Sequence, residues 1–406
     1  MKILITTDAY TAMINGVAIS VKTLATALED AGHEVRILTL SQTHQSYIDR
    51  NIYAVGSVPL KIYPDTRASL QLHDPLVEEL ITWAPDIIHS QSEFFTFLFA
   101  KRIAKQLQIP IVHTYHTLYE YYTHYFCPNK TIGRSIVSTV SRFICQKADA
   151  IIAPTQKTEK ILEGYGVTNP IHVVPTGLSF DRFHVTTDDS FTEQIRTKFR
   201  IPSDAPVLVT LGRVAREKNI DFLIEQMAHP AIRSKNVHLI VVGDGPDRER
   251  LESITHNLDL KFFVHFTGMV APEHVVSYYH LGNAFVSASN SETQGLTYIE
   301  ALACGLPLLC RKDECLQDVL EPNQNGYFFE NSEMFVAHCL NLLENSKKLT
   351  AMSENALQSS YKFSKESFGI NAISIYQKTI LSRRESKSCT RFVCIPKQIW
   401  HKVTGC

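Results

Sequence analysis

Short apolar runs alternate with amphipathic helical patterns along nearly the whole chain. This alternation is typical of βα units, in which each strand of a parallel sheet is followed by a helix that crosses back over the sheet. The expected strands of the first half are KILITT, EVRILTL, DIIHSQ, PIVHTYH, AIIAPT and IHVVPTG, and those of the second half are VLVTLGR, VHLIVVGDG, VHFTG, AFVSAS and PLLCR. The pattern therefore predicts an α/β protein built from two parallel sheets.

The same pattern divides the chain into domains. We expect one Rossmann-like domain over residues 1–178 and a second over residues 206–364. Residues 179–205 are polar and lack apolar periodicity, so we predict that they form a linker. A last helical pattern covers residues 365–382, and a basic tail follows over residues 383–406. When two such sheets face each other, a ligand binds at the carboxyl ends of the strands, in the cleft.

Composition narrows the class of protein. The 406 residues are 44% hydrophobic and 20% charged, which suits two domains with sizeable cores. A net charge of −1 provides no overall field to attract nucleic acid. The nine cysteines never occur as Cys-x-x-Cys, so we expect reduced thiols and no zinc site. Without a secretion-signal pattern or an apolar run of roughly 18 residues, we expect a cytoplasmic protein that at most touches a membrane.

The first strand is followed by TTDAYTAMINGVAIS, which puts Asn15 and Gly16 directly before an expected helix. A glycine there lets a ligand approach the backbone, and the free N–H groups of a helix N-terminus attract an anion. A tight turn between strand and helix explains the same residues equally well. The segment is therefore a candidate phosphate contact that needs support from elsewhere in the chain.

Two cations follow the first strand of the second half, in LGRVAREKN. The spacing of Arg213 and Lys218 allows both to reach the mouth of the cleft, where an Arg fork and a Lys point charge would neutralise a diphosphate. The alternative is a solvated charge run that also includes Arg216 and Glu217. The order of strand, Gly-Arg and helix-opening Lys favours the binding site.

The segment SETQGLTYIE holds two acids, Glu292 and Glu300, with no cation between them. The N–H groups of the expected helix start, which includes Gly295 and Leu296, lie between these acids and suit a diphosphate. One carboxylate could then bind ribose hydroxyls and the other the hydroxyls of a sugar. Alternatively, Glu292 is an acid favoured by the helix dipole and Glu300 is an ordinary exposed helix residue. Together with the two cations, the acids favour a nucleotide-sugar site.

These motifs resemble a known family. SETQGLTYIEALACGLP resembles the Glu-x7-Glu signature of retaining glycosyltransferases of family 4, and LGRVAREKN and VVGDGP resemble two further landmarks. The resemblance implies the GT-B fold, in which two Rossmann-like domains face a nucleotide-sugar cleft and the last helix crosses back to the N-terminal domain. It also implies that Arg213 and Lys218 bind the donor diphosphate, that Glu300 binds the ribose, and that Glu292 contacts the transferred sugar. Many members have Gly-Gly where this chain has Asn-Gly, which leaves Gly16 for the close approach.

The N-terminal half resembles one branch of that family. His116 in HTYHTLYEYY matches the N-domain histidine that lies near the reacting sugar. This segment and DAYTAMINGVAISVKTLATALEDAGHEV resemble the bacterial diacylglycerol glucosyltransferases. The resemblance implies that UDP-glucose is the donor, that the first domain binds the acceptor, and that the acceptor is diacylglycerol. A GDP-sugar donor, or another lipid or a polysaccharide as acceptor, stays open as the alternative.

We expect no required metal or other cofactor. His113, His116 and His124 are close in sequence, but the first two differ by three positions and so do not share one face of a strand. The chain has no Asp-x-Asp pair to hold Mg²⁺ on a diphosphate, and the pair of cations can do that electrostatic work. A dinucleotide-dependent oxidoreductase would need Gly-x-Gly-x-x-Gly after a strand, which is missing. A sugar-nucleotide-binding module without activity could have lost the acids, which are present.

Two basic and apolar segments suggest contact with an anionic membrane surface. NKTIGRSIVSTVSRFICQKA is compatible with an amphipathic helix, and the tail from Arg383 onward combines six basic residues with aromatic and aliphatic ones. Anionic lipid attracts such surfaces by about 1 kcal/mol per basic residue. The alternatives are a crossover helix that faces the core and a disordered tail. The membrane interpretation would put the protein on the inner face of the cell membrane as a peripheral enzyme.

Overall fold

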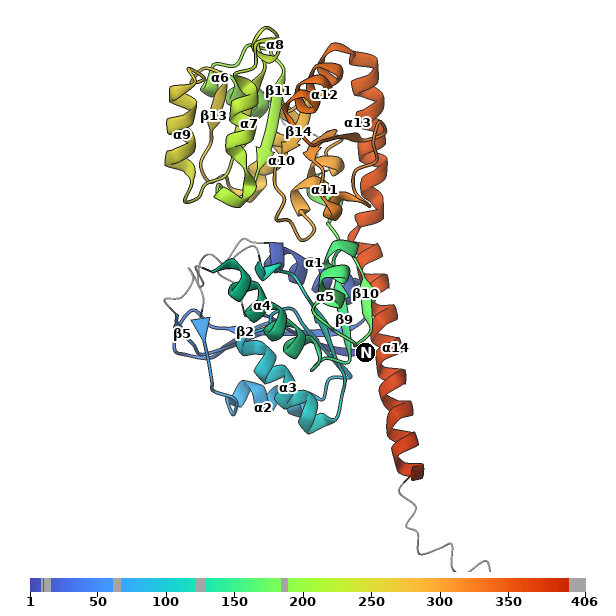
Figure 1. The fold of residues 1–406 in the computed structure, drawn as a ribbon. Helices are drawn as coiled ribbons and strands as arrows, with labels where there is room; N and C mark the ends of the chain where they lie inside the picture. The colour runs from blue at the N-terminus through green and yellow to red at the C-terminus, as the bar shows by residue number, and fades with distance from the viewer. Residues whose placement is uncertain (9, 11–15, 61–66, 121–128, 184–188, 394–406) are drawn as a thin grey trace, which may run out of the picture.

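The computed structural model describes residues 1–393 except residues 9, 11–15, 61–66, 121–128 and 184–188, and it consists of two α/β domains connected along one side by a long helix (Figure 1). The first domain has an eight-stranded sheet in the order β10-β9-β8-β7-β1-β2-β4-β3. Its strands are β1 (Lys2–Thr6), β2 (Glu34–Leu40), β3 (Tyr47–Asp49), β4 (Ile52–Val55), β7 (Ile87–Ser90), β8 (Ile111–Thr114), β9 (Ala150–Ala153) and β10 (Ile171–Val173). Neighbouring strands are parallel, apart from the antiparallel pair of β3 and β4.

Helices cover this sheet, and a small ribbon stands beside it. The helices are α1 (Gly16–Asp30), α2 (Pro75–Trp83), α3 (Phe95–Leu107), α4 (Lys130–Cys145) and α5 (Gln156–Gly164). The ribbon pairs β5 (Val58–Pro59) with β6 (Arg67–Ala68) in antiparallel register.

The second domain has a six-stranded parallel sheet in the order β13-β12-β11-β14-β15-β16. Its strands are β11 (Val207–Leu211), β12 (His238–Val242), β13 (Val264–Phe266), β14 (Ala284–Ser287), β15 (Leu308–Arg311) and β16 (Gly326–Phe329). Its helices are α7 (Ile220–Met227), α8 (Pro230–Arg233), α9 (Arg248–Asn257), α10 (Val275–Leu281), α11 (Leu296–Ala303), α12 (Ser332–Glu344) and α13 (Ser346–Ser360). The two predicted parallel sheets are thus confirmed, and each predicted strand forms.

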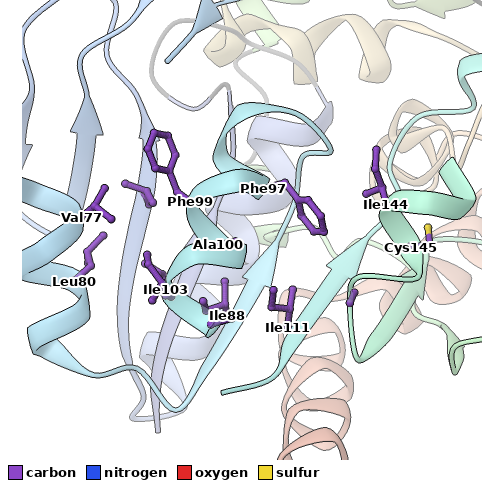
Figure 2. Packing of buried hydrophobic residues seen from close by; sticks show 14 of the residues in the cluster. Val77, Leu80, Ile88, Phe97, Phe99, Ala100, Ile103, Ile111, Ile144 and Cys145 are labelled. Carbon is purple, nitrogen blue, oxygen red and sulfur yellow. The ribbon is translucent and has the colours of Figure 1, made fainter. Parts of the chain in front are cut away.

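Burial on both faces explains why the strands are continuous apolar runs. Leu4 packs in one hydrophobic cluster with Ile88 and Phe99, whereas its neighbours Ile3 and Ile5 pack in another cluster on the opposite face. This is the alternation that a strand imposes on successive side chains. Figure 2 shows the first of these clusters, where side chains of α2 and α3 meet those of β7 and β8. The sheet is therefore covered by apolar layers on both sides.

The segment predicted as a linker, residues 179–205, contains structure of its own. A 3-10 turn, η2 (Phe180–Arg182), and a helix, α6 (Asp189–Phe199), form within it. Ile195 of α6 is buried in a cluster with Val207 and Tyr278 of the second domain. Because charged and polar residues dominate this helix, its few apolar positions gave no clear periodicity in the sequence. The linker prediction was wrong for α6, which packs against the second domain.

The last helix, α14, runs from Lys365 to Val393, so it continues beyond residue 382, where the sequence analysis ended it. Residues 383–393 contain neither Gly nor Pro and include several good helix formers, so nothing local stops the helix. Residues 394–406, the remainder of the expected tail, lie outside the described residues. The basic tail therefore begins as a helical extension.

Helix α14 packs on the first domain. Phe368, Ala372, Ile375 and Tyr376 share a buried cluster with residues of β1 and α1. Gly369 lies so close to α1 that a Cβ atom there would be 2.9 Å from the Cβ of Ala27. Arg383 adds an ion pair of 2.6 Å to Asp149. Among the described residues, none of the helices is long and apolar enough to cross a membrane.

Candidate active site

A hollow lies at the carboxyl ends of the second sheet, between β11 and its neighbours. It is lined by Thr210, Leu211, Gly212, Arg213, Lys218, Ile220, Val241, Val242, Ser287, Glu292 and Thr297. β11 pairs with β12 on one side and with β14 on the other, so the order of strands reverses at this point. Such a reversal opens the crevice in which parallel α/β sheets bind ligands. The two predicted cations and the first predicted acid meet here.

Lys218 and Glu292 form a direct ion pair. Lys218 ends the 3-10 turn η3 (Arg216–Lys218) after β11, and Glu292 lies in the loop after β14. Burial raises the pKa of Glu292, but the charge of Lys218 and its hydrogen bond outweigh this effect and hold the pKa below 4.5. The acid is ionised at neutral pH. Its cation comes from 74 positions earlier in the chain, so the absence of a cation from SETQGLTYIE did not mean an unpaired acid.

Arg213 also has an acidic partner. Its guanidinium contacts the carboxylate of Glu217, whose side chain is largely buried. Arg216 differs, because its side chain is 82% exposed and lies 3.8 Å from Asp247. The alternative of a solvated charge run therefore describes Arg216, whereas Arg213 and Lys218 line the hollow and Glu217 pairs with Arg213.

Glu300 is buried within helix α11. The residue is 6% exposed, and Oε2 of its side chain accepts a 2.9 Å hydrogen bond from the hydroxyl of Tyr279. An ordinary exposed helix residue, the alternative left open by the sequence, is thus excluded. Tyr279 was not predicted, because it lies in α10 and only the fold brings it to α11.

The start of α11 faces the start of α1. Gly295 precedes α11 with a φ of 73°, and a Cβ atom there would lie 2.3 Å from the ring of Tyr298, so the position requires glycine. A Cβ atom on Gly16, the first residue of α1, would lie 3.7 Å from Cδ1 of Leu296. The structure therefore brings Gly16 close to Leu296 from the other domain. Asn15 lies outside the described residues.

His116 follows β8 and belongs to a buried chain of polar groups. Its Nε2 is 2.5 Å from Oε1 of Gln91, whose amide nitrogen is 3.1 Å from Nε2 of His89. His89 in turn is bonded through Nδ1 to the hydroxyl of Tyr376 in α14, at 2.5 Å. Burial lowers the pKa of His116 to about 4, so the ring is neutral at physiological pH. With the Gln91 oxygen as acceptor, Nε2 carries the hydrogen and Nδ1 the lone pair.

The neighbouring His113 has contacts of its own. His113 is buried in β8, edge-on to the ring of Phe97, and its Nε2 lies 3.8 Å from Oε1 of Glu93. His124 lies outside the described residues. Over the part of the chain that the structure describes, no three His, Cys, Asp or Glu side chains are grouped as metal ligands.

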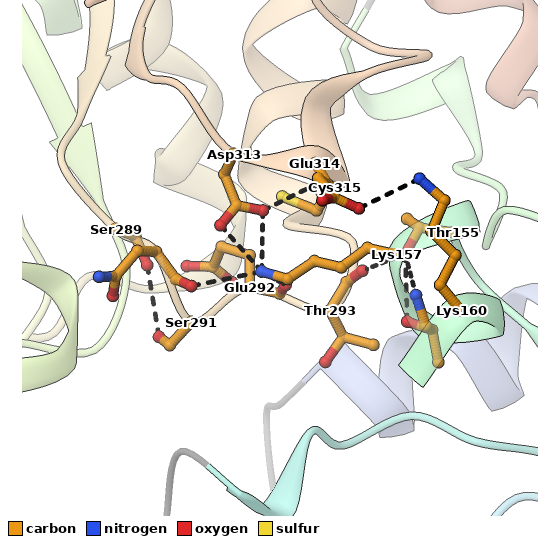
Figure 3. Close-up of polar contacts among 12 residues, drawn as sticks. Thr155, Lys157, Lys160, Ser289, Ser291, Glu292, Thr293, Asp313, Glu314 and Cys315 are labelled. Atoms are coloured by element: carbon orange, nitrogen blue, oxygen red, sulfur yellow. Dashed lines mark hydrogen bonds and ion pairs between the residues drawn. The ribbon is translucent and has the colours of Figure 1, made fainter. Parts of the chain in front are cut away.

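The first domain also contacts the loop that carries Glu292, which sequence analysis did not foresee. Lys157, at the start of α5, reaches across to this loop and to Asp313 in the second domain (Figure 3). Thr155, the residue that caps α5, donates a 2.8 Å hydrogen bond to the carbonyl of Thr293. In sequence these two residues look like the start of any helix. The site therefore lies where the two domains meet.

Comparison with known proteins identifies this architecture. Residues 14–182 match the domain described as Glycosyltransferase Family 4, and residues 191–359 match that described as Glycosyl transferases group 1. The chain is 32% identical over 408 residues to an alpha-monoglucosyldiacylglycerol synthase of Streptococcus pneumoniae, covering 99% of this chain and 91% of the relative. The chain belongs to glycosyltransferase family 4. Membership in this family makes the chain a hexosyltransferase. It therefore excludes the two other classes considered from the sequence, a dinucleotide-dependent oxidoreductase and a sugar-nucleotide-binding module without activity.

Two further comparisons agree with the family. An alpha-monoglucosyldiacylglycerol synthase of Acholeplasma laidlawii is 29% identical over 390 residues, which cover 93% of this chain and 96% of the relative. The solved structure of a sucrose-phosphate synthase from Thermosynechococcus elongatus superposes with a TM-score of 0.72, over 94% of this chain and 99% of that chain, at 20% identity. The family 4 enzyme thus has the GT-B fold, as the motifs predicted.

Proposed function

We propose that this family 4 enzyme transfers glucose from UDP-glucose to diacylglycerol with retention of configuration. The observation that carries the proposal is the arrangement of Arg213, Lys218 and Glu292 around one hollow at the reversal of strand order. Two relatives that match nearly the whole chain are named alpha-monoglucosyldiacylglycerol synthase, and these names support glucose as the transferred sugar and diacylglycerol as the acceptor. A GDP-sugar donor or another lipid or polysaccharide acceptor is the alternative.

In this proposal, the second domain binds the donor. Arg213 and Lys218 hold the diphosphate, and the N-terminus of α11 at Gly295 and Leu296 adds backbone N–H groups. Glu300, oriented by Tyr279, binds the ribose. Glu292 lies next to Lys218 and accepts hydrogen bonds from hydroxyls of the sugar. No metal ion is needed to neutralise the diphosphate, because two cations already line the hollow.

In the proposed reaction, the two cations stabilise the negative charge that develops on the leaving diphosphate. The bond between the anomeric carbon and the phosphate oxygen breaks while the acceptor oxygen bonds to the same face of that carbon. The acceptor's proton goes to an oxygen of the departing phosphate, and UDP leaves. Negative charge grows on the β-phosphate as this bond breaks, so Arg213 and Lys218 stabilise the transition state more than the bound donor. Neutral His116 orients the sugar with a lone pair and adds no charge of its own.

We further propose that the first domain docks on an anionic membrane through α4. Ile132, Ile136, Val140 and Phe143 are 48% to 59% exposed and lie within one arc of the helix, whereas Val137 and Ile144 face the core. A core-facing crossover helix explains the buried face but not this exposed apolar stripe. Arg134, Arg142 and Lys147 are exposed on the same helix or directly after it. This arrangement is typical of a surface that inserts apolar side chains among anionic head groups.

A transfer screen tests the proposed donor and acceptor. The purified enzyme is incubated separately with UDP-glucose, UDP-galactose and GDP-mannose, with dioleoylglycerol in vesicles that contain phosphatidylglycerol, and the lipid product is identified by mass spectrometry. Glu292→Gln is measured in parallel and is expected to lose transfer, and its circular dichroism spectrum checks that its fold is that of wild type. We expect hexosyl-diacylglycerol from UDP-glucose. Transfer from GDP-mannose in preference, or no transfer to the diacylglycerol from any donor, would contradict the proposal.

A further inference from the structure

Lys157 is a buried lysine of the first domain whose ammonium group binds to the second domain. It is the second residue of α5 in the first domain and is 7% exposed. Its ammonium lies 2.8 Å from both carboxylate oxygens of Asp313 and 3.3 Å from the carbonyl oxygens of Asn290 and Glu292. Three N–H groups thus meet four acceptors, all of them in the second domain, and the charge is balanced by one carboxylate.

Several residues of the loop that carries Glu292 form hydrogen bonds with the first domain. Beyond the carbonyls that Lys157 binds, the carbonyl of Thr293 accepts from Thr155, and the side chain of Gln294 forms two hydrogen bonds to the backbone of Thr176, at 2.8 Å and 3.0 Å. The second domain contributes the ion pair of Lys218 with the carboxylate of Glu292 and two long contacts of Ser291 Oγ, to the carbonyl of Glu217 and to Ser289 Oγ, each at 3.4 Å. The loop backbone, in contrast, is bound mainly by the first domain. The position of this loop therefore depends on the neighbouring domain.

We infer that Lys157 is a positioning residue for Glu292: it fixes the backbone that presents this carboxylate, so that the sugar side of the donor site is complete only when the two domains hold this arrangement. The inference rests on the role proposed for Glu292. Lysine suits the task because its compact ammonium directs three donors along different lines, whereas the planar fork of arginine would not meet both carbonyls and the carboxylate. Arg213 comes from the second domain and pairs with Glu217 of the same domain, so it does not depend on this contact.

The pair with Asp313 offers a second way to break the contact. Asp313 lies just before η5 (Glu314–Leu316), and its Oδ1 also accepts a 2.8 Å bond from the N–H of Cys315. Asp313→Asn keeps an oxygen for this cap but removes the charge that balances Lys157. A matched control is available at the same interface, where Lys160 forms a 3.3 Å ion pair with Glu314 and both side chains are more than half exposed.

Hydrogen–deuterium exchange of the loop tests the inference without reference to any substrate. The variants are Lys157→Met, Asp313→Asn and the control Lys160→Ala, each in the full chain. We expect Lys157→Met and Asp313→Asn to speed amide exchange over residues 291–294 by about tenfold or more, and Lys160→Ala to leave it unchanged. Exchange at wild-type rates in both test variants, or an equal acceleration in the control, would overturn the inference.

Kinetics of the same variants separate positioning from folding. With UDP-glucose and dioleoylglycerol, we expect Lys157→Met to lower kcat about tenfold or more while the Kd for UDP changes less than about threefold. Glu292→Gln is measured in parallel. If Glu292→Gln keeps full activity, the proposed role of Glu292 fails; if it loses activity while Lys157→Met keeps both kcat and loop protection, only the inference about Lys157 fails.

Discussion

Lys218 and Glu292 are direct partners across the hollow, although they follow different strands and are 74 positions apart in the chain. A diphosphate that binds Lys218 competes with this carboxylate for the same ammonium. The pair holds the ammonium of Lys218 in the hollow, beside the carboxylate that we propose contacts the sugar.

Removing the cation is expected to impair transfer. Lys218→Met takes away a charge that stabilises the leaving diphosphate and leaves Glu292 without its ion pair, so kcat/KM is expected to fall about 10²-fold or more. Steady-state kinetics against UDP-glucose measure the change. Arg216→Met, in the same segment but largely exposed, is the matched control and is expected to stay near the wild-type value. A loss of less than about threefold in Lys218→Met would remove that residue from the donor site.

Glu300 is expected to act on donor affinity. Glu300→Gln replaces a charged acceptor with a neutral one at nearly the same shape, so the KM for UDP-glucose is expected to rise about tenfold with a smaller change in kcat. Tyr279→Phe removes the hydrogen bond that orients this carboxylate and is expected to change KM in the same direction, by less. If Glu300→Gln lowers kcat and leaves KM unaltered, the ribose assignment is wrong.

Buried Glu93 provides a prediction about pH and stability. Burial is the main cause that raises its pKa, which reaches about 7, although a 2.8 Å hydrogen bond from Tyr119 acts in the opposite direction. A raised folded-state pKa contributes stability that is present below the unfolded value near 4.5 and is lost as pH rises through about 7. Glu93→Gln cannot ionise and does not suffer this loss. Its stability relative to wild type should therefore increase between about pH 5 and pH 8, by at most about 3 kcal/mol.

Urea unfolding of wild type and Glu93→Gln at the two pH values measures this difference. Other titrating groups, among them the nearby Asp8 and His113, are common to both proteins and largely cancel in the comparison. A stability difference that is the same at both pH values would mean that Glu93 titrates in the folded protein as it does in the unfolded chain.

The exposed stripe of α4 is expected to govern membrane binding. Phe143→Asp places a charge among side chains that would insert into lipid, so partitioning onto vesicles rich in phosphatidylglycerol should fall about tenfold. Phe262→Asp, on an aromatic residue of the second domain that is even more exposed than Phe143, is the control and should bind like wild type. Sedimentation with vesicles gives both values. Equal partitioning of Phe143→Asp and wild type would exclude α4 as the docking helix.

Much of the fold could be predicted because strands buried on both faces leave continuous apolar runs in the sequence. β12, buried at each of its five positions, is the clearest example. β3 at the sheet edge, its neighbour β4, and β16 with its glycine gave weaker signals and were missed. The helix α6 was missed because polar residues surround its few buried ones.

For the candidate site, the sequence indicated residues whose place follows from the order of strands and helices along the chain. Arg213, Lys218 and Glu292 each lie in a segment that follows a strand, and parallel sheets bring such segments to one edge, whereas Glu300 lies inside the helix after β14. The partners Glu217, Tyr279 and Lys157 could not be foreseen, because their contacts depend on side-chain packing between helices or between domains. Local sequence thus indicates which residues lie at the carboxyl edge of the sheet, whereas their contact partners depend on the tertiary structure.

The most direct test of the proposed reaction is the structure of its lipid product. Wild-type enzyme is supplied with UDP-glucose and dioleoylglycerol, and the purified product is analysed by proton NMR for the identity of the sugar and the configuration at its anomeric carbon. The account predicts α-linked glucosyl-diacylglycerol, because transfer to the same face retains the α configuration of the donor. A β-linked product, or a sugar that remains unattached to the lipid, would contradict it.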